Sequence, residues 1–228
     1  MKTTELVKNE KQKSEESTMK EEKNNNGLTE IVFILDRSGS MSGYEADVIG
    51  GFNATIEKQR KETGTALVSV VLFDNLTNVV YDRVNIDNVK PMTATDFRVG
   101  GCTALLDAIG GAIRHIGNVH KYARKEDIPE HTIFLITTDG EENASHLYSS
   151  RRVKEMIKHQ REKYGWEFIF VASNIDAVET ADRYGILKER AVRCAQSPEG
   201  IQDGYVCFSE AISCVRNKKS LDDGKWKN

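Results

Sequence analysis

Five side chains that carry oxygen stand out in the sequence by their type and spacing. Three of them, Asp36, Ser38 and Ser40, alternate in the stretch ILDRSGSM, directly after an apolar run. In a turn that leaves a strand, side chains two residues apart can point the same way, so these three can face one ion. Hard divalent cations such as Mg²⁺ or Mn²⁺ prefer oxygen ligands, whereas zinc and copper favour nitrogen and sulfur. The stretch therefore predicts a site for a hard cation.

The other two oxygen donors, Thr103 and Asp139, lie far away in the sequence. Thr103 is in GGCTALLDA, at the start of a predicted helix, and Asp139 is in TTDGEEN, directly after an apolar segment. Hydroxyl groups coordinate without adding charge, so an ion held mainly by Ser and Thr, with only two carboxylates nearby, stays electropositive. Such an ion would accept a carboxylate from another molecule. We expect one metal site formed by Asp36, Ser38, Ser40, Thr103 and Asp139.

The elements that would position these residues are short apolar strands alternating with helices. Four segments are β-rich and apolar on both faces, as central parallel strands must be. These predicted strands span residues 31–35, 67–73, 132–137 and 168–172, and the predicted helices lie near 46–61, 104–122, 151–163 and 199–215. The alternation predicts right-handed crossovers and an α/β fold, with a doubly wound, Rossmann-like, mostly parallel sheet and helices on both faces.

Two edge strands complete the predicted sheet. Residues 79–84 follow the second strand after only DNLTN, which is too short for a crossover helix, so they are expected as an antiparallel edge strand. The residues around Val192 are expected at the other edge. Such a sheet binds ligands beyond the carboxyl ends of its strands, where neighbouring crossovers diverge to opposite faces. Asp36 and Asp139 are both expected at that edge.

The composition indicates one main domain between charged tails. The chain has 228 residues, 39% of them hydrophobic, which suits a single α/β core. We expect this domain at 27–217 and tails at 1–26 and 218–228. The first tail holds six Lys and six Glu with few hydrophobic residues, too few to offset the entropy lost on ordering.

The charge and hydropathy patterns argue against nucleic acid and membranes as partners. The formal net charge is −3, so no whole-protein field attracts the chain to nucleic acid or anionic lipid. The apolar runs are far shorter than the roughly 20 residues that span a bilayer, and the N-terminus lacks an apolar signal segment. These features predict a cytoplasmic protein.

Other polar residues are expected to have ordinary roles. The cysteines form no C-x-x-C pair and are expected to be reduced thiols. They are Cys102, Cys194, Cys207 and Cys214. Glu142, in DGEEN, is expected in a solvated turn, and Asp176 is expected to cap a helix.

Three blocks of the sequence, EIVFILD with its D-x-S-x-S continuation, GGCTALLDAI and IFLITTDGEEN, resemble the metal-ion-dependent adhesion site of a von Willebrand factor type A domain. The resemblance covers about residues 28–215 and is closest to stand-alone, bacterial-type intracellular members. It implies that Ser38 and Ser40 bind the ion directly, that Thr103 joins or leaves its ligand set, and that Asp36 and Asp139 act largely through bound water. It also implies Mg²⁺, with Mn²⁺ or Ca²⁺ possible, and a protein partner that supplies an Asp or Glu.

Two simpler or different interpretations stay open. Ser and Gly after a strand are common turn residues, and Asp36 could cap the segment that follows it. The same edge could also serve a hydrolase or phosphotransferase, with Asp36 as nucleophile or the ion as Lewis acid. That alternative lacks support, because D-R-S stands where such phosphatases place a second acid and because no G-x-x-x-x-G-K-[ST] or G-x-S-x-G occurs. We therefore predict a non-enzymatic, metal-dependent protein-interaction module whose oligomeric state the sequence leaves open.

Overall fold

A six-stranded sheet forms the centre of the computed structural model, which describes residues 27–173 and 176–227. The strand order is β3-β2-β1-β4-β5-β6, and every neighbouring pair is parallel except β2 and β3. The strands are β1 (Thr29–Asp36), β2 (Ala66–Phe73), β3 (Thr77–Asn85), β4 (His131–Thr138), β5 (Glu167–Ala172) and β6 (Ala191–Arg193). The predicted fold class and both predicted edge strands are confirmed.

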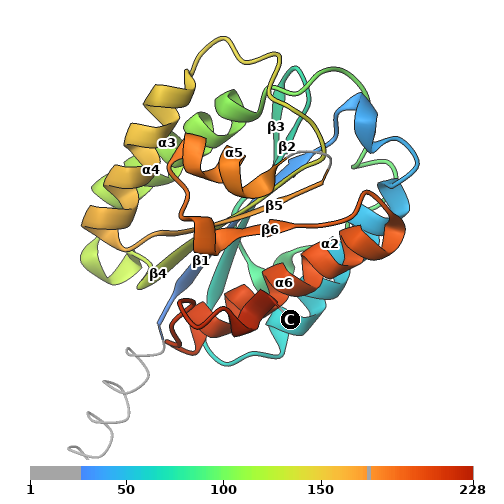
Figure 1. Ribbon diagram of the computed structural model, residues 1–228. Coiled ribbons are helices and arrows are strands. Elements are labelled where there is room, and N and C mark those ends of the chain that lie inside the picture. The colour runs from blue at the N-terminus through green and yellow to red at the C-terminus, as the bar shows by residue number, and fades with distance from the viewer. Residues whose placement is uncertain (1–26, 174–175, 228) are drawn as a thin grey trace, which may run out of the picture.

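Helices cover both faces of this sheet (Figure 1). One face packs against α2 (Glu45–Arg60) and α6 (Pro198–Arg216), and the other against α3 (Leu105–Tyr122), α4 (Ser150–Tyr164) and α5 (Ala177–Tyr184). Among the described residues, four short 3₁₀ helices lie in the connections and a fifth follows α6: η1 (Gly39–Met41), η2 (Ile86–Asn88), η3 (Lys125–Asp127), η4 (Lys188–Arg190) and η5 (Lys225–Lys227). No helix in the described part of the chain is long and apolar enough to cross a membrane.

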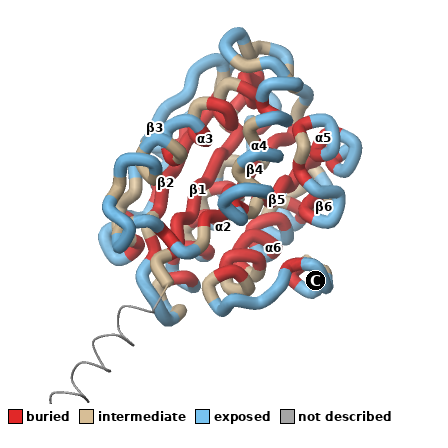
Figure 2. Tube along the Cα trace, turned by 90° about the vertical axis from the view of Figure 1, so that its left-hand side faces the viewer, coloured by how far each residue is buried: buried red, intermediate tan, exposed pale blue. Residues whose placement is uncertain are grey.

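The apolar residues of β1 divide between the two faces, which is why this strand reads as a continuous hydrophobic run. Ile31, Phe33 and Leu35 belong to the core beneath α2 and α6, and Val32 and Ile34 to the core beneath α3, α4 and α5. All five side chains are fully buried, and Figure 2 shows the buried strands at the centre of the molecule. Burial on both faces holds the strand ends rigidly, so the loops that leave them are well anchored.

Side-chain caps and glycines set the ends of the shorter helices. The Ser149 hydroxyl accepts a hydrogen bond from the Arg152 N–H at the start of α4, and Gly165 ends that helix in the left-handed conformation with φ 65°. Asp176 accepts from the Glu179 N–H and caps α5, as expected from the sequence. These local signals fix where the helices begin and end.

The C-terminal segment differs from the sequence-based expectation. A tail was expected from residue 218 onward, but Leu221 and Trp226 are buried in the core beneath α6. The Trp226 indole N–H and the Arg190 guanidinium both donate to the Leu221 carbonyl, at 3.0 and 3.2 Å, and Arg190 also pairs with Asp222 at 2.7 Å. These two apolar side chains are enough to order an otherwise polar segment, because both pack in the core. The expected tail at 1–26 lies outside the described residues.

Candidate metal site

The two acidic residues of the predicted site lie at the ends of neighbouring parallel strands. Asp36 is the last residue of β1, and Asp139 directly follows β4. The chain leaves β1 through α2 toward one face of the sheet, whereas α3, which leads into β4, covers the other face. The crossovers therefore diverge between these two strands, which is where sheets of this kind bind their ligands.

The turn after β1 is shaped by Asp36 itself. Its Oδ1 accepts a 2.7 Å hydrogen bond from the Ser38 N–H, which bends the chain back over the strand end. The Gly39 N–H then donates to the Gly101 carbonyl at 3.0 Å, and Arg37 forms a 3.0 Å ion pair with Asp74 at the end of β2. The first predicted loop is thereby joined to the loop that carries Thr103.

Four of the five predicted donors converge at this edge of the sheet. The Ser38 and Ser40 hydroxyl oxygens lie 3.1 Å apart, and the Ser40 hydroxyl donates to Asp139 Oδ1 at 2.6 Å. A Cβ placed on Gly140 would lie 3.6 Å from both the Ser40 and the Thr103 hydroxyl oxygens. The absence of a side chain at position 140 leaves these two hydroxyls facing a shared space.

Asp36 occupies a different place from the other four. It is fully buried, and both of its carboxylate oxygens are used, Oδ1 by the Ser38 N–H and Oδ2 by the Thr138 hydroxyl at 2.7 Å. The structure therefore places Asp36 behind the hydroxyl donors, where it fixes the positions of Ser38 and Thr138.

The converging oxygens fit a hard divalent cation. Around an ion with bonds of about 2.1 Å, adjacent oxygens of an octahedron lie about 3.0 Å apart, close to the 3.1 Å between the Ser38 and Ser40 hydroxyls. No group of three or more His, Cys, Asp and Glu residues gathers within 27–173 and 176–227. The candidate set is instead rich in hydroxyl groups, and its chemistry suits Mg²⁺ better than zinc or copper.

The arrangement of strands and helices matches solved structures of known proteins. Proximal thread matrix protein 1 from the mussel byssus matches 83% of this chain with a TM-score of 0.55 and 14% identity. The von Willebrand factor type A protein from Catenulispora acidiphila matches 80% with a TM-score of 0.52 and 15% identity. This chain has the von Willebrand factor type A fold.

The sequence itself matches no protein-family model and no curated protein. The type A fold of this chain corresponds to 46% of the byssus protein and 42% of the Catenulispora protein, so each of those chains is more than twice the length of the shared part. At these identities the likeness is one of fold, and the properties of the longer proteins do not transfer with it.

Burial disfavours the ionised forms of the Asp36 and Asp139 carboxyl groups. Burial raises the pKa of the Asp36 carboxyl, although hydrogen bonds from Thr138 and Ser38 act in the opposite direction. Burial also raises the pKa of Asp139, partly offset by hydrogen bonds from Ser40 and Gln196. A cation bound beside them would favour their charged forms.

Several residues that support the site were not predicted from the sequence. Thr138 holds Asp36, and the Gln196 side-chain N–H donates to Asp139 Oδ2 at 3.2 Å. The Asn143 side chain accepts from the Thr103 N–H at 2.9 Å, while the Asn143 N–H donates to the Thr103 carbonyl. Thr138 could have been found as a hydroxyl next to Asp139 in TTDG. Gln196 follows β6, 57 positions after Asp139, and no local pattern marks it.

Glu142 is a correction to the sequence analysis. It was expected in a solvated turn, but it is only partly exposed and accepts hydrogen bonds from the N–H groups of Leu106, Ala144 and Ser145. The carboxylate therefore joins the first turn of α3 to the loop that follows Asp139. Its role is to hold this loop against the helix that begins after Thr103.

Proposed function

We propose that the protein is a metal-dependent protein-interaction module whose divalent cation accepts an Asp or Glu side chain from a partner. The type A fold supports an interaction module in general. The observation that carries the metal-dependent part is the convergence of the Ser38, Ser40 and Asp139 oxygens, with hydroxyl separations of the size that a small cation needs. Thr103 lies on the same side of Gly140 as Ser40.

Under this proposal the five residues of the site have different roles. Ser38, Ser40 and Thr103 supply neutral hydroxyl ligands, Asp139 supplies a carboxylate next to them, and Asp36 positions the turn from behind. When bound, the cation provides positive charge for the partner's carboxylate. Because the hydroxyl ligands Ser38, Ser40 and Thr103 are neutral, the cation would keep positive charge toward a partner. Mg²⁺ is the proposed ion, with Mn²⁺ and Ca²⁺ as alternatives.

The buried position of Asp36 favours binding over catalysis. A carboxylate nucleophile needs an accessible oxygen, whereas Asp36 is fully buried with both oxygens hydrogen-bonded. A metal-dependent hydrolase or phosphotransferase is therefore the less favoured function. Robust turnover of a phosphoester or acyl ester that disappears in Asp36→Ala would overturn this ranking. The cytoplasm is the proposed location, to be tested by cell fractionation.

Calorimetric titration with Mg²⁺ tests the metal site. We expect the Ser38→Ala, Ser40→Ala double variant to bind Mg²⁺ at least tenfold more weakly than wild type, with unchanged circular dichroism. Ser42→Ala is the matched control, because Ser42 is an exposed serine of the same loop. Unchanged Mg²⁺ affinity in the double variant would contradict the assignment.

Recovery of bound proteins from a cell extract tests the partner interaction. Proteins that bind the wild-type chain in Mg²⁺ are expected to be lost both when a chelator is added and when the double variant replaces wild type. The Ser42→Ala control should retain them. Partners that remain bound in chelator would show that the main interaction does not use the metal.

A further inference from the structure

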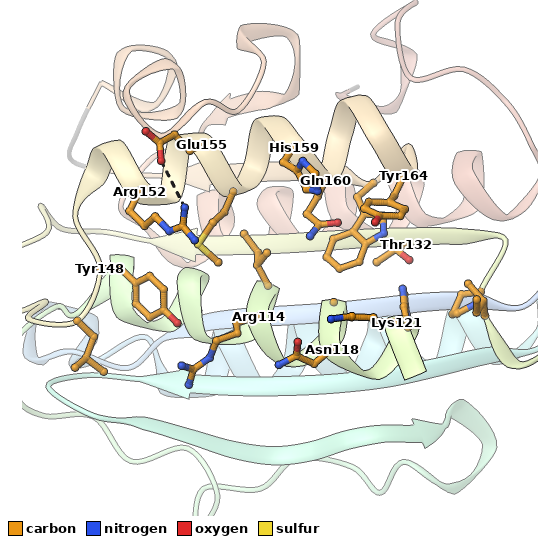
Figure 3. Close-up of a pocket in the computed structure, with 18 of the residues that line it drawn as sticks. Arg114, Asn118, Lys121, Thr132, Tyr148, Arg152, Glu155, His159, Gln160 and Tyr164 are labelled. Atoms are coloured by element: carbon orange, nitrogen blue, oxygen red, sulfur yellow. Dashed lines mark ion pairs between the residues drawn. The ribbon is translucent and has the colours of Figure 1, made fainter. Parts of the chain in front are cut away.

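A groove lies between α3 and α4 on the outside of the molecule (Figure 3). Its volume is about 1190 Å³. It runs from the loop before α4, at Leu147 and Tyr148, toward Pro129 and Glu130 near the start of β4. None of the residues that form the proposed metal site lines it, so the groove calls for a separate explanation.

Helical spacing arranges the polar side chains along the α3 wall of the groove. Arg114, Asn118 and Lys121 are separated by four and three residues, so they lie on one face of α3. Seven residues of helix place Arg114 and Lys121 about 10 Å apart along the axis. Figure 3 shows these side chains on α3, with Arg152 and Gln160 on the facing helix α4.

The positive charges of the α3 wall have no acidic partners in the described part of the chain. Neither Arg114 nor Lys121 has a carboxylate within 4.0 Å among the residues that the structure describes. The two carboxylates that line the groove are already paired, Glu155 with Arg152 at 3.6 Å and Glu130 with Lys218 at 2.7 Å. Among the described residues, the α3 wall therefore presents two exposed cations with no carboxylate beside them, and the Lys121 ammonium lies 5.1 Å from the centre of the Tyr122 ring.

The α4 wall is balanced in charge where it lines the groove, because Arg152 and Glu155 pair with each other at 3.6 Å. The other Lys and Arg residues of α4 do not line the groove. The positive field of the groove therefore comes from Arg114 and Lys121 on α3. A field of this kind attracts an acidic partner and orients it on the surface.

The floor of the groove is apolar. Ile113, Met156 and the buried Trp166 line it between the two charged walls. Gly117 adds no side chain there, and a Cβ at this position would lie 3.4 Å from the Gln160 side-chain nitrogen. An apolar floor beside a cationic wall suits a protein segment with both apolar and acidic side chains, whereas a nucleic acid backbone would leave the floor without contacts.

We infer that the groove between α3 and α4 binds an acidic segment of a partner protein, in which two carboxylates about 10 Å apart pair with Arg114 and Lys121 and an apolar side chain between them contacts the floor. In a helical partner this spacing corresponds to acidic residues seven positions apart. The contact requires no metal. It would be a second interaction surface in addition to the proposed metal site.

Fluorescence anisotropy with a defined probe tests this inference. The probe is a labelled 14-residue helical peptide of Ala and Gln with two Glu seven positions apart and one Leu between them, and the matched control peptide has Lys in place of Glu. All titrations use the full chain in chelator, so loss of the proposed metal site does not affect the result. We expect the acidic peptide to bind and the Lys peptide not to bind.

Charge-reversal variants locate the contact. Arg114→Glu with Lys121→Glu should weaken peptide binding at least tenfold, and Arg114→Gln with Lys121→Gln should weaken it several-fold with less perturbation of the helix. Lys90→Glu with Lys188→Glu is the control, because both residues are exposed and lie outside the groove while the net charge changes equally. This control should bind within twofold of wild type.

Three results would overturn the inference. One is equal affinity of wild type and both groove variants for the acidic peptide. Another is tighter binding of a 12-nucleotide single strand than of the peptide at the same ionic strength, which would assign the surface to nucleic acid. The third is displacement of the probe by a synthetic peptide of residues 1–26 at lower concentration than by unlabelled probe, which would assign the groove to the chain's own N-terminal segment.

Discussion

Asp139 accepts a 2.6 Å hydrogen bond from the hydroxyl of Ser40, a residue 99 positions earlier in the chain. This bond joins the loop after β1 to the loop after β4 and brings a carboxylate beside two serine hydroxyls. The second carboxylate oxygen of Asp139 accepts a hydrogen bond from the Gln196 side chain. Both oxygens of Asp139 are therefore oriented by side chains from other loops, which gives the candidate site its geometry.

Gln196 is predicted to position Asp139 for metal binding. Gln196→Ala removes the hydrogen bond to Asp139 Oδ2 but no proposed ligand. Because residues that orient metal ligands typically contribute about 10-fold to 100-fold in affinity, we expect Mg²⁺ binding to weaken by about tenfold in calorimetry. The fold should be retained, and Gln202→Ala on the exposed face of α6 should behave as wild type. Unchanged affinity in Gln196→Ala would assign this bond a purely structural role.

The raised pKa of Asp36 predicts a pH dependence of stability in the absence of metal. A folded-state pKa above the ordinary value of 3.8 means that the folded protein holds its proton more tightly than the unfolded chain. The stabilising contribution is complete below pH 3.8 and is lost as the pH rises through the raised folded-state pKa. In chelator at pH 7, Asp36→Asn should therefore be at least as stable as wild type.

Urea unfolding of both proteins at a series of pH values measures this effect. The difference in unfolding free energy between Asp36→Asn and wild type should shift in favour of wild type as the pH is lowered toward 3.8. Addition of Mg²⁺ at pH 7 should stabilise wild type and not the variant. A difference that is constant across the pH range would show that ionisation of Asp36 does not limit stability.

A buried ion pair at the opposite end of β1 is predicted to be important for stability. Glu30 is fully buried and pairs with Arg83 at 2.9 Å, with a further contact to His120 at 3.1 Å. Arg83→Ala leaves the Glu30 carboxylate without its main partner, so we expect a loss of about 3 kcal/mol. Glu30→Gln combined with Arg83→Ala should recover part of this loss in chemical denaturation. Equal destabilisation by the single and double variants would indicate that the lost packing of Arg83, and not its charge, matters.

The C-terminal segment is predicted to be part of the folded core. Trp226 is 1% exposed and packs against the cluster beneath α6, so Trp226→Ala should destabilise the protein by about 3 kcal/mol or more. Thermal unfolding measures this loss. Lys225→Ala, in the same segment but with an exposed side chain, is the control and should unfold like wild type. A Trp226→Ala variant as stable as wild type would restore the view of this segment as a tail.

The sequence by itself determined the fold class and the set of candidate ligands. Strands such as β1 and β4 are apolar on both faces, because helices cover both sides of the sheet. Such continuous hydrophobic runs can be recognised from the residue types alone. The type and spacing of Asp36, Ser38 and Ser40 likewise indicate oxygen donors without any knowledge of neighbours. The antiparallel edge strand at 79–84 follows from the length of the loop before it, which is equally local.

Only the tertiary structure decided which residues support the site and which surfaces remain open. Gln196 reaches Asp139 from the loop after β6, and Glu142 holds α3, through contacts between segments that no local pattern relates. The burial of Trp226 and the positions of Arg114 and Lys121 in the groove depend in the same way on the packing of α6, α3 and α4. Such contacts join segments that are distant in the sequence. The residue pattern of a segment predicts whether it forms a helix or a strand, but its contacts with other segments form only when the elements pack.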